Sequence, residues 1–300
     1  MDRLDAMSLF VATVEAGSLS AASRHIGIPL ATVSRRLSEL EKHLGTRLLN
    51  RSTRRLTLTD AGQSYLSACR RILDEVSEAE RTAAGEYSDP TGELVITAPV
   101  VFGRLHVLPV VTGFLAAYPD VDIRLTLSDR ITQLAEEHID LAVRIGELPD
   151  SAMVAMRVGS IRRIVCASPA YLAEHGMPRE PHDLAGQNCI TFEGLASPAT
   201  WSFGAGKTET TIPVRSRLQV NTAEAAIDAA IAGLGLTKVL SYQADAAVRA
   251  GTLSVVLEAF EPPPWPVSLV HAGHSRLPVK LRAFLDFAAP RLRARLARSL

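Results

Sequence analysis

Three glycines, at positions 17, 27 and 45, constrain the fold of this chain most, because each ends a run of apolar residues at helical spacing. Glycine commonly ends helices, since it adopts the left-handed backbone conformation without steric cost. The runs predict a first helix before Gly17, a short second helix over 20–26 with Ser18 as N-cap, and a third over about 30–44. A tight glycine turn between the last two is typical of a helix-turn-helix. The expected apolar contacts are Leu4, Met7, Phe10, Val11, Val14, Ile26, Ile28, Val33, Leu37 and Leu40.

The following segment changes its apolar period. Leucines at 48–49 and at 56 and 58 flank a basic turn and then alternate with threonines, which predicts a small β-hairpin wing with a cationic tip. From Thr59 to about Gly85 a long helix is predicted. Its narrow apolar seam with charged flanks is typical of a helix that pairs with another helix. The seam comprises Tyr65, Ala68, Ile72, Val76, Ala79 and Ala83.

Charge is distributed unevenly along the chain. The whole sequence has 32 basic and 32 acidic residues and a formal net charge of zero. Residues 1–59 contain nine basic and five acidic residues, so this segment alone has a net charge of +4. Because Lys and Arg neutralise phosphates, a basic helix-turn-helix with a basic wing indicates double-stranded DNA as its partner.

The third helix and the wing carry the side chains best suited to DNA recognition. Arg35 and Ser34 are candidates for reading bases, because Arg bonds guanine edges bidentately and Ser bonds bases or phosphates. Thr32 and Arg36 are expected at phosphates, and Arg54 in the minor groove. Any amphipathic helix has a polar face, so it is the flanking helix and wing that favour DNA contact. The candidates are Ser18, Ser20, Ala31, Thr32, Ser34, Arg35, Arg36, Arg51, Arg54 and Arg55.

Several of these residues have two possible roles. Arg51 and Arg55 are either backbone contacts or solvated loop charges. The free amides where the second helix begins, at Ser18 and Ser20, could bind a phosphate, and Ser18 could equally be a plain N-cap.

Beyond residue 92, short β-like runs alternate with helical runs. Helices are expected at about 108–117, 130–137, 222–232 and 278–298, with strands such as 94–98 and 236–240 between them. This alternation predicts mainly parallel sheets with helices on both faces. The Gly-, Ser- and Pro-containing stretch at 85–92 predicts a hinge.

The sequence favours no catalytic, metal or cofactor chemistry. The motifs G-x-S-x-G, G-x-x-x-x-G-K-[ST] and H-E-x-x-H are missing, and the eight histidines do not cluster at ligand spacing. Cys69, Cys166 and Cys189 are odd in number and far apart, which argues against disulfides and leaves core packing or redox sensing. With no secretory signal and no apolar run of about 18–20 residues, a cytoplasmic protein without a membrane segment is predicted. A solvated basic helix face is expected at Arg291, Arg293, Arg295 and Arg298.

Residues 1–87 resemble the N-terminal region of the LysR-type transcriptional regulators. The resemblance is carried by F-V-A-T-V-E-A-G-S-L-S-A-A-S at 10–23, T-V-S-R-R-L-S-E-L-E at 32–41, L-G-T-R-L-L-N-R at 44–51 and L-T-L-T-D-A-G at 56–62. A DNA-binding module followed by a larger α/β module extends it over the whole chain. Leu30 stands where many members have glutamine, and Ser23 where alanine is common.

The resemblance implies a multidomain α+β protein: a winged helix-turn-helix, a linker and dimerisation helix, and an effector-binding domain. The implied boundaries are 1–59, 60–87 and 88–300. The last domain is expected to resemble type 2 periplasmic binding proteins, with two α/β subdomains and the ligand between them. Subdomain I is expected at about 92–160 and 267–300, subdomain II at about 161–266, and the crossing strands near 159–168 and 258–268.

Ligands of open α/β sheets bind at the carboxyl ends of strands and at helix N-termini. Asn221 or Thr222 could equally be only the N-cap of its helix, and Arg144 either anchors an anion or pairs with a carboxylate. Val100 and Val101 are apolar, so an apolar or aromatic effector is expected. The effector-site candidates are Ala98, Pro99, Val100, Val101, Ser128, Asp129, Arg144, Gly146, Asn221 and Thr222.

The resemblance also implies a homo-oligomer, either a dimer or a dimer of dimers, bound to an interrupted dyad in a promoter. Contact with RNA polymerase is left open. An effector would shift the population of subdomain arrangements and thereby change the DNA bend. The alternatives are an effector-independent architectural DNA binder and a solute-binding protein or enzyme.

Overall fold

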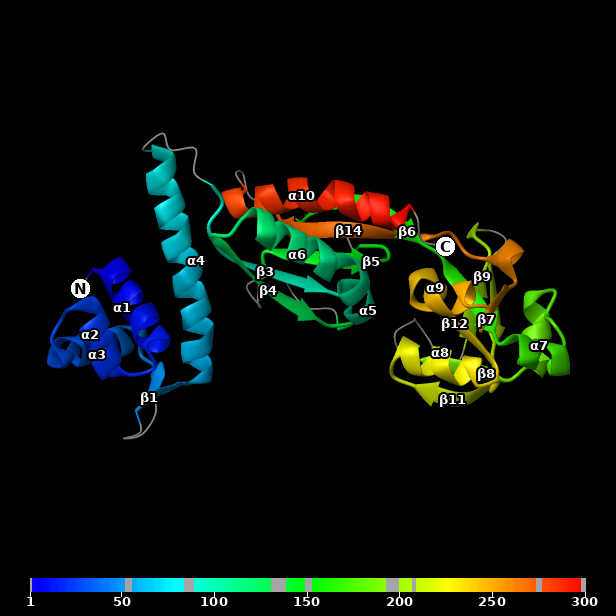
Figure 1. Cartoon of the computed structure of the whole chain (residues 1–300). Helices are drawn as coiled ribbons and strands as arrows, with labels where there is room; N and C mark the ends of the chain where they lie inside the picture. Colours follow the sequence, from blue (N-terminus) through cyan, green and yellow to red (C-terminus); the bar gives the residue numbers. More distant parts are fainter. Residues whose placement is uncertain are drawn as a thin grey trace. The chain divides into compact units, whose positions relative to one another are not determined.

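The computed structural model describes residues 2–51, 56–83, 89–130, 139–148, 153–192, 200–206, 209–273 and 277–297 (Figure 1). The chain divides into two compact units, Met1–Gly92 and Glu93–Leu300. Three helices, a two-stranded hairpin and a long helix make up the first unit. Its elements are α1 (Arg3–Glu15), α2 (Leu19–Ile26), α3 (Leu30–Leu44), β1 (Leu49–Arg51), β2 (Leu56–Leu58) and α4 (Asp60–Ala83).

The local signals in the sequence set the ends of these helices as predicted. The Ser18 hydroxyl accepts a hydrogen bond from the Ala21 amide at 3.1 Å and caps α2. Gly27 and Gly45 end α2 and α3 with φ angles of 76° and 67°, in the left-handed region. The helix-turn-helix and the antiparallel wing are therefore confirmed.

The core of the first unit differs from the expected one at two helices. α1 buries Ala6, Leu9, Phe10 and Thr13, whereas Leu4 is 39% exposed. The Thr13 hydroxyl donates to the Leu9 carbonyl at 2.7 Å, so a polar residue takes part in the buried face without an unpaired group. Ile26 is likewise 38% exposed and is not a core residue. The buried set comprises Ala6, Leu9, Phe10, Val33, Leu37, Leu40, Leu48, Leu49, Leu66 and Cys69.

Thr59 and Gly62 join the wing to α4. The Thr59 hydroxyl donates to the Arg47 carbonyl at 2.7 Å and accepts from the Gly62 amide at 2.9 Å. A Cβ at Gly62 would lie 2.0 Å from the Leu48 carbonyl oxygen, closer than any side chain permits. The close approach of α4 to Leu48, the residue before β1, therefore requires glycine at position 62.

The second unit contains two five-stranded sheets. Sheet I has the order β4-β3-β5-β14-β6, and sheet II has the order β11-β8-β12-β7-β13. The strands of sheet I are β3 (Gly92–Ala98), β4 (Val121–Leu127), β5 (Leu141–Ile145), β6 (Met153–Ile161) and β14 (Trp265–Ala272). Those of sheet II are β7 (Arg163–Ala167), β8 (Cys189–Phe192), β11 (Ser216–Val220), β12 (Leu236–Leu240) and β13 (Ser254–Val256).

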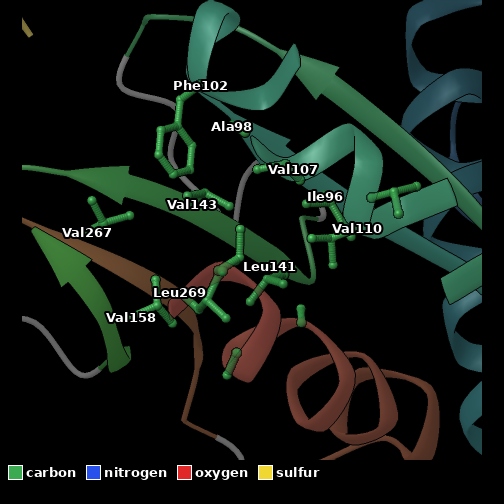
Figure 2. Packing of buried hydrophobic residues seen from close by; sticks show 14 of the residues in the cluster. Ile96, Ala98, Phe102, Val107, Val110, Leu141, Val143, Val158, Val267 and Leu269 are labelled. Atoms are coloured by element: carbon green, nitrogen blue, oxygen red, sulfur yellow. The ribbon is translucent and has the colours of Figure 1, made fainter. Parts of the chain in front are cut away.

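Helices cover both sheets. Against sheet I pack α5 (Val100–Phe102), the π-helix η1 (Gly103–Val107), α6 (Leu108–Ala117) and α10 (Val279–Leu296). In the core of sheet I, Ile96 lies near Val107 and Val110, and Leu141 lies near Leu269 (Figure 2). Sheet II carries α8 (Ala223–Ile231) and α9 (Ser241–Arg249) on one face. Its other face is covered by α7 (Pro169–His175) and a hairpin of β9 (Thr200–Phe203) and β10 (Thr210–Pro213).

The sheets are mixed rather than mainly parallel, which corrects the sequence prediction. β3 runs parallel to β5, but β14 is antiparallel to both β5 and β6. In sheet II, β7 and β13 likewise form the antiparallel pairs. The chain crosses from sheet I to sheet II at Arg162, between β6 and β7, and returns through 257–264, between β13 and β14. Each of these antiparallel pairs includes a strand that flanks one of the two crossings.

The first helix of the second unit is longer than predicted. It begins at Val100, not Leu108, so only Ala98 and Pro99 of the expected 98–101 loop precede it. Val100–Ala117 is long and apolar enough to cross a membrane by length and composition, although Arg104 and His106 interrupt its apolar run. In the structure it packs Phe102, Val110 and Phe114 into the sheet I core. The helix predicted near 130–137 lies almost wholly outside the described residues.

Candidate nucleic-acid interface and ligand site

The exposed face of α3 gathers the predicted DNA-reading residues. Val33, Leu37 and Leu40 form its buried stripe, and Ala31, Arg35 and Ser38 lie about half a turn away and are exposed. The Arg35 side chain is 68% exposed and its Nη1 lies 3.3 Å from Glu39 Oε1. This ion pair orients the guanidinium along the helix surface and leaves its other nitrogens for a ligand.

The other candidates occupy the flanks of α3 and the start of α2. Thr32 and Ser34 are half-buried and Arg36 is exposed. Ser18 is an N-cap, as one of its two expected roles requires, and Ser20 is exposed in the first turn of α2. The predicted contacts of Arg54, Arg55 and the Arg51 side chain fall outside the described residues.

Two polar contacts that the sequence did not predict hold α3 in position relative to α2 and the wing. The Ser23 hydroxyl donates to the Ile28 carbonyl at 2.7 Å, which ties α2 to the turn before α3. Glu41 Oε1 accepts from the Leu48 and Leu49 amides at 2.9 and 3.1 Å, which ties α3 to the wing. Helix periodicity and capping patterns do not predict either contact, because each joins a side chain to the main chain of the segment that follows its helix.

The apolar stripe of the long helix α4 is covered in its first half and only partly covered in its second. Leu66 and Cys69 are buried in the core of the first unit, and Tyr65 packs with Phe10 at a ring-centroid distance of 5.6 Å. Farther along, Ile72 and Val76 of the predicted seam are only half-buried. The second half of α4 therefore retains apolar surface within a single chain.

Four candidate ligand residues meet at the carboxyl ends of β3 and β4 in sheet I. Asp129 Oδ1 accepts a hydrogen bond from the Val100 amide at 3.0 Å, and the Ser128 amide donates to the Ala98 carbonyl at 2.9 Å. Val100 is 39% exposed, whereas Val101 is 5% exposed and belongs to the core. Asp129 thus occupies the first free amide of this helix, where an anionic ligand would otherwise bind.

The remaining candidates divide between the two sheets. Arg144 is half-buried on β5, and Gly146 follows that strand with a φ angle of 109° and its amide bonded to the Pro266 carbonyl. Thr222 caps α8 by accepting from the Ala225 amide at 3.3 Å, so the N-cap role considered for it is present. Asn221 beside it is exposed.

An aromatic cluster that the sequence did not predict connects the sheets. Tyr242 of α9 lies edge-on to Phe102 and His106, with ring centroids at 5.4 and 5.6 Å. Burial raises the pKa of Tyr242, and the charges of Asp129 and Glu224 raise it further. Two carboxylates, Asp129 after β4 and Glu224 in the first turn of α8, therefore act on the ionisation of the Tyr242 hydroxyl.

His106 is buried in this cluster, and none of the described residues forms a hydrogen bond with either of its ring nitrogens. Burial lowers its pKa to about 4, and the nearby Arg295 acts in the same direction while Asp245 opposes it. The imidazole is therefore neutral at physiological pH and behaves as an aromatic ring with one unused donor and one unused acceptor.

Salt bridges join the two chain crossings. Arg162 contacts Glu261 at 2.7 Å and Glu258 at 2.9 Å, and these bonds raise the pKa of its guanidinium. The next residue, Arg163, lies over the Trp265 ring at 4.5 Å. Two salt bridges and one cation–π contact therefore connect the first crossing to the second and to the start of β14.

The three cysteines are buried, and two arginines of the predicted basic face on α10 bond the main chain. Burial raises the pKa of Cys69 to about 11 and of Cys166 and Cys189 to about 12, so reactive thiolate is scarce at neutral pH. Arg293 and Arg295 are exposed, but each donates to a main-chain carbonyl, at 3.4 and 3.2 Å. Among the described residues no His, Cys, Asp or Glu groups could hold a metal ion.

A surface groove lies on α10 and beside the residue that follows α6. None of the predicted effector residues lines it. Its lining comprises Tyr118, Val279, Arg282, Ala283, Asp286, Phe287 and Arg291.

The sequence of both units matches known families. Residues 4–63 match "Bacterial regulatory helix-turn-helix protein, lysR family", and residues 88–293 match "LysR substrate binding domain". An HTH-type transcriptional repressor of Pseudomonas aeruginosa (strain UCBPP-PA14) is 37% identical over 289 residues, which cover 96% of this chain and 91% of that protein.

Solved structures agree over the whole length. CrgA, a LysR-type transcriptional regulator from Neisseria meningitidis, has a TM-score of 0.61 and 30% identity, covering 96% of this chain and 98% of that one. AphB, a virulence activator of Vibrio cholerae and member of the LTTR protein family, has a TM-score of 0.60 and 29% identity, covering 95% and 98%.

Proposed function

The chain belongs to the LysR family of transcriptional regulators, with a DNA-binding helix-turn-helix and an effector-binding domain, and we propose that Arg35 and Ser34 read bases from α3. The observation that carries this assignment is the exposed guanidinium of Arg35, held by Glu39 on the face of α3 opposite its buried stripe. Thr32 and Arg36 hold flanking phosphates, and Ser18 and Ser20 hold another at the start of α2. The wing residues Arg51, Arg54 and Arg55 complete the surface.

Gel-shift titrations on an operator selected from random duplexes test this assignment. Arg35→Ala should weaken operator binding about tenfold to a hundredfold and relax the preference for one base pair. Arg36→Ala should weaken binding to all sequences alike and reduce the salt dependence by about one phosphate. Arg217→Ala, an exposed arginine of β11, is the matched control and should change neither. Unchanged operator affinity for Arg35→Ala would overturn the assignment.

The effector site is proposed at the junction marked by Tyr242. We assign Val100, Asp129 and Thr222 to this site, together with Ala98, Pro99, Ser128 and Asn221. Because Asp129 already holds the Val100 amide at 3.0 Å, an aromatic ligand without a carboxylate suits the site better than an anionic one. Effector binding shifts the arrangement of the subdomains and thereby the DNA bend. Arg144, Gly146 and Val101 are supporting residues in this proposal.

A thermal-shift comparison tests the effector class. Matched neutral and anionic aromatic compounds, such as benzamide and benzoate, should differ, with stabilisation by the neutral series growing with concentration. Asp129→Asn should reduce that preference because it removes the competing carboxylate. Equal stabilisation of the wild-type protein by both series would contradict the proposed class. A protein that no compound stabilises, but that still selects an operator, would instead favour an architectural DNA binder.

Pairing of the α4 helices is proposed to form the dimer that binds an interrupted dyad in the promoter. Ile72 and Val76 supply the half-buried seam. Val76→Asp should shift the mass of the particle toward the monomer, whereas Ser77→Asp, which places the same charge on an exposed neighbour, should not. We extend this proposal in three ways: two such dimers form a dimer of dimers, the protein acts in the cytoplasm, and it contacts RNA polymerase.

A further inference from the structure

The recognition helix α3 begins with an apolar residue exposed to solvent. Leu30 is 45% exposed, more than Leu4, Ile26 or Leu44, the other exposed large apolar residues in the described part of the first unit. Ala31, the next residue, is exposed as well. Nearly half of Leu30 is therefore left uncovered by its own unit, and this apolar surface is available to a partner.

Leu30 stands beside the two residues proposed to read bases. On a helix, side chains four residues apart are neighbours, which places Leu30 next to Ser34 and Ala31 next to Arg35. Helical side chains also tilt toward the N-terminus, so Leu30 and Ala31 are the leading side chains of α3. Helix-turn-helix proteins use this end of the recognition helix to contact base edges.

The chemistry of the major groove leaves one type of partner for an apolar side chain there. Leu30 has no hydrogen-bond donor or acceptor, and Pro29 at the N-cap provides no side-chain cap bond. The apolar group that base edges display in the major groove is the 5-methyl of thymine. We infer that Leu30, supported by Ala31, contacts a thymine methyl in each half-site, and so specifies a T·A pair beside the pair read by Arg35.

This inference rests on the proposed entry of α3 into the major groove, and the experiment separates the two. The full-length protein first selects an operator from random duplexes, and failure to select one would count against the proposed DNA contacts. Each thymine of the selected site is then replaced singly by deoxyuridine, which removes only the methyl group. Loss of one buried methyl should weaken binding about fourfold at one thymine per half-site.

Variants assign that methyl to Leu30. Leu30→Ala should bind thymine and uracil operators equally, because the contacting side chain has been removed. Leu44→Ala is the matched control: a leucine at the other end of the same helix, 37% exposed, whose removal should leave the fourfold discrimination intact. Leu30→Gln should select a different base at this position, since its amide can bond adenine.

Two results would overturn the inference. The first is a wild-type protein that binds every uracil-substituted operator as tightly as the thymine operator. The second is Leu30→Ala that still distinguishes the two, or that changes the oligomeric state instead, which would place Leu30 between copies of the chain. Circular dichroism of the variant checks folding, and because Leu30 is exposed and alanine favours helices, the native spectrum is expected.

Discussion

The two units hold their functional residues in place by contacts of very different range. In the first unit, Ser18 caps α2 through an amide three residues away, and Arg35 pairs with Glu39 four residues away. In the second unit, Val100 bonds Asp129 across 29 residues and Arg162 bonds Glu261 across 99. The DNA-contacting residues of α2 and α3 are therefore positioned largely by contacts within a few residues. The proposed effector site, in contrast, forms only when segments far apart in the sequence come together.

The largest loss of stability is expected where a glycine in each unit lies against the main chain of a neighbouring segment. Gly62→Ala places a Cβ 2.0 Å from the Leu48 carbonyl oxygen, and Gly235→Ala places one 2.2 Å from that of Asn188. Each should destabilise its own unit by at least about 3 kcal/mol, because backbone on both sides must move. In calorimetry, each variant should lower the unfolding temperature of its own unit and leave that of the other unit unchanged.

Gly186→Ala is the control for these variants. Its added Cβ meets nothing within 4 Å, so it should change neither transition appreciably. If Gly62→Ala lowered both transitions equally, the two units would be coupled in stability and the division between them would not hold. DNA binding should fall in parallel with the first transition only.

The difference in range also explains what the sequence could and could not predict. The ends of α2 and α3 follow from Ser18, Gly27 and Gly45, because caps and left-handed glycines act within a few residues. The aromatic cluster of Phe102 and Tyr242 gave no signal, since its partners are far apart in sequence.

Two errors of the sequence prediction have the same physical origin. The buried face of α1 includes Thr13 and leaves Leu4 exposed, because the neighbours of a helix, and not its apolar pattern alone, decide which face is covered. The antiparallel pairs of β14 and β7 arise where the chain crosses between the sheets, which the alternation of strands and helices does not encode.

A second prediction concerns a buried cation in sheet II. Lys238 is 7% exposed, donates to the Ser202 carbonyl and lies 4.7 Å from the Phe203 ring centroid. Burial lowers its pKa from 10.5 to about 8, and the charge of Arg163 adds to this. Lys238→Met should stabilise the second unit by about 1–3 kcal/mol at pH 7, because it removes a charge that the fold holds unfavourably.

The pH dependence fixes the sign of this effect. The unfolded chain binds the Lys238 proton more tightly than the folded chain, so the stability of the wild-type unit should rise between about pH 8 and pH 10.5 from this group. The advantage of Lys238→Met should be full below pH 8 and shrink above it. Denaturant titrations at pH 7 and pH 10 measure the difference. A constant advantage would mean that packing, not charge, explains it.

The smallest effects come from a matched pair of N-caps, one in each unit. Ser18 accepts from Ala21 at 3.1 Å and Thr222 from Ala225 at 3.3 Å, so alanine at either position should cost about 1 kcal/mol. Because the stability costs are alike, any functional difference must come from what each hydroxyl contacts besides its own helix. Ser18→Ala should weaken DNA binding beyond its stability cost if the α2 terminus holds a phosphate, while Thr222→Ala should leave it unchanged. Equal DNA binding by both variants would reduce Ser18 to a cap and leave α3 and the wing as the DNA-contacting surface.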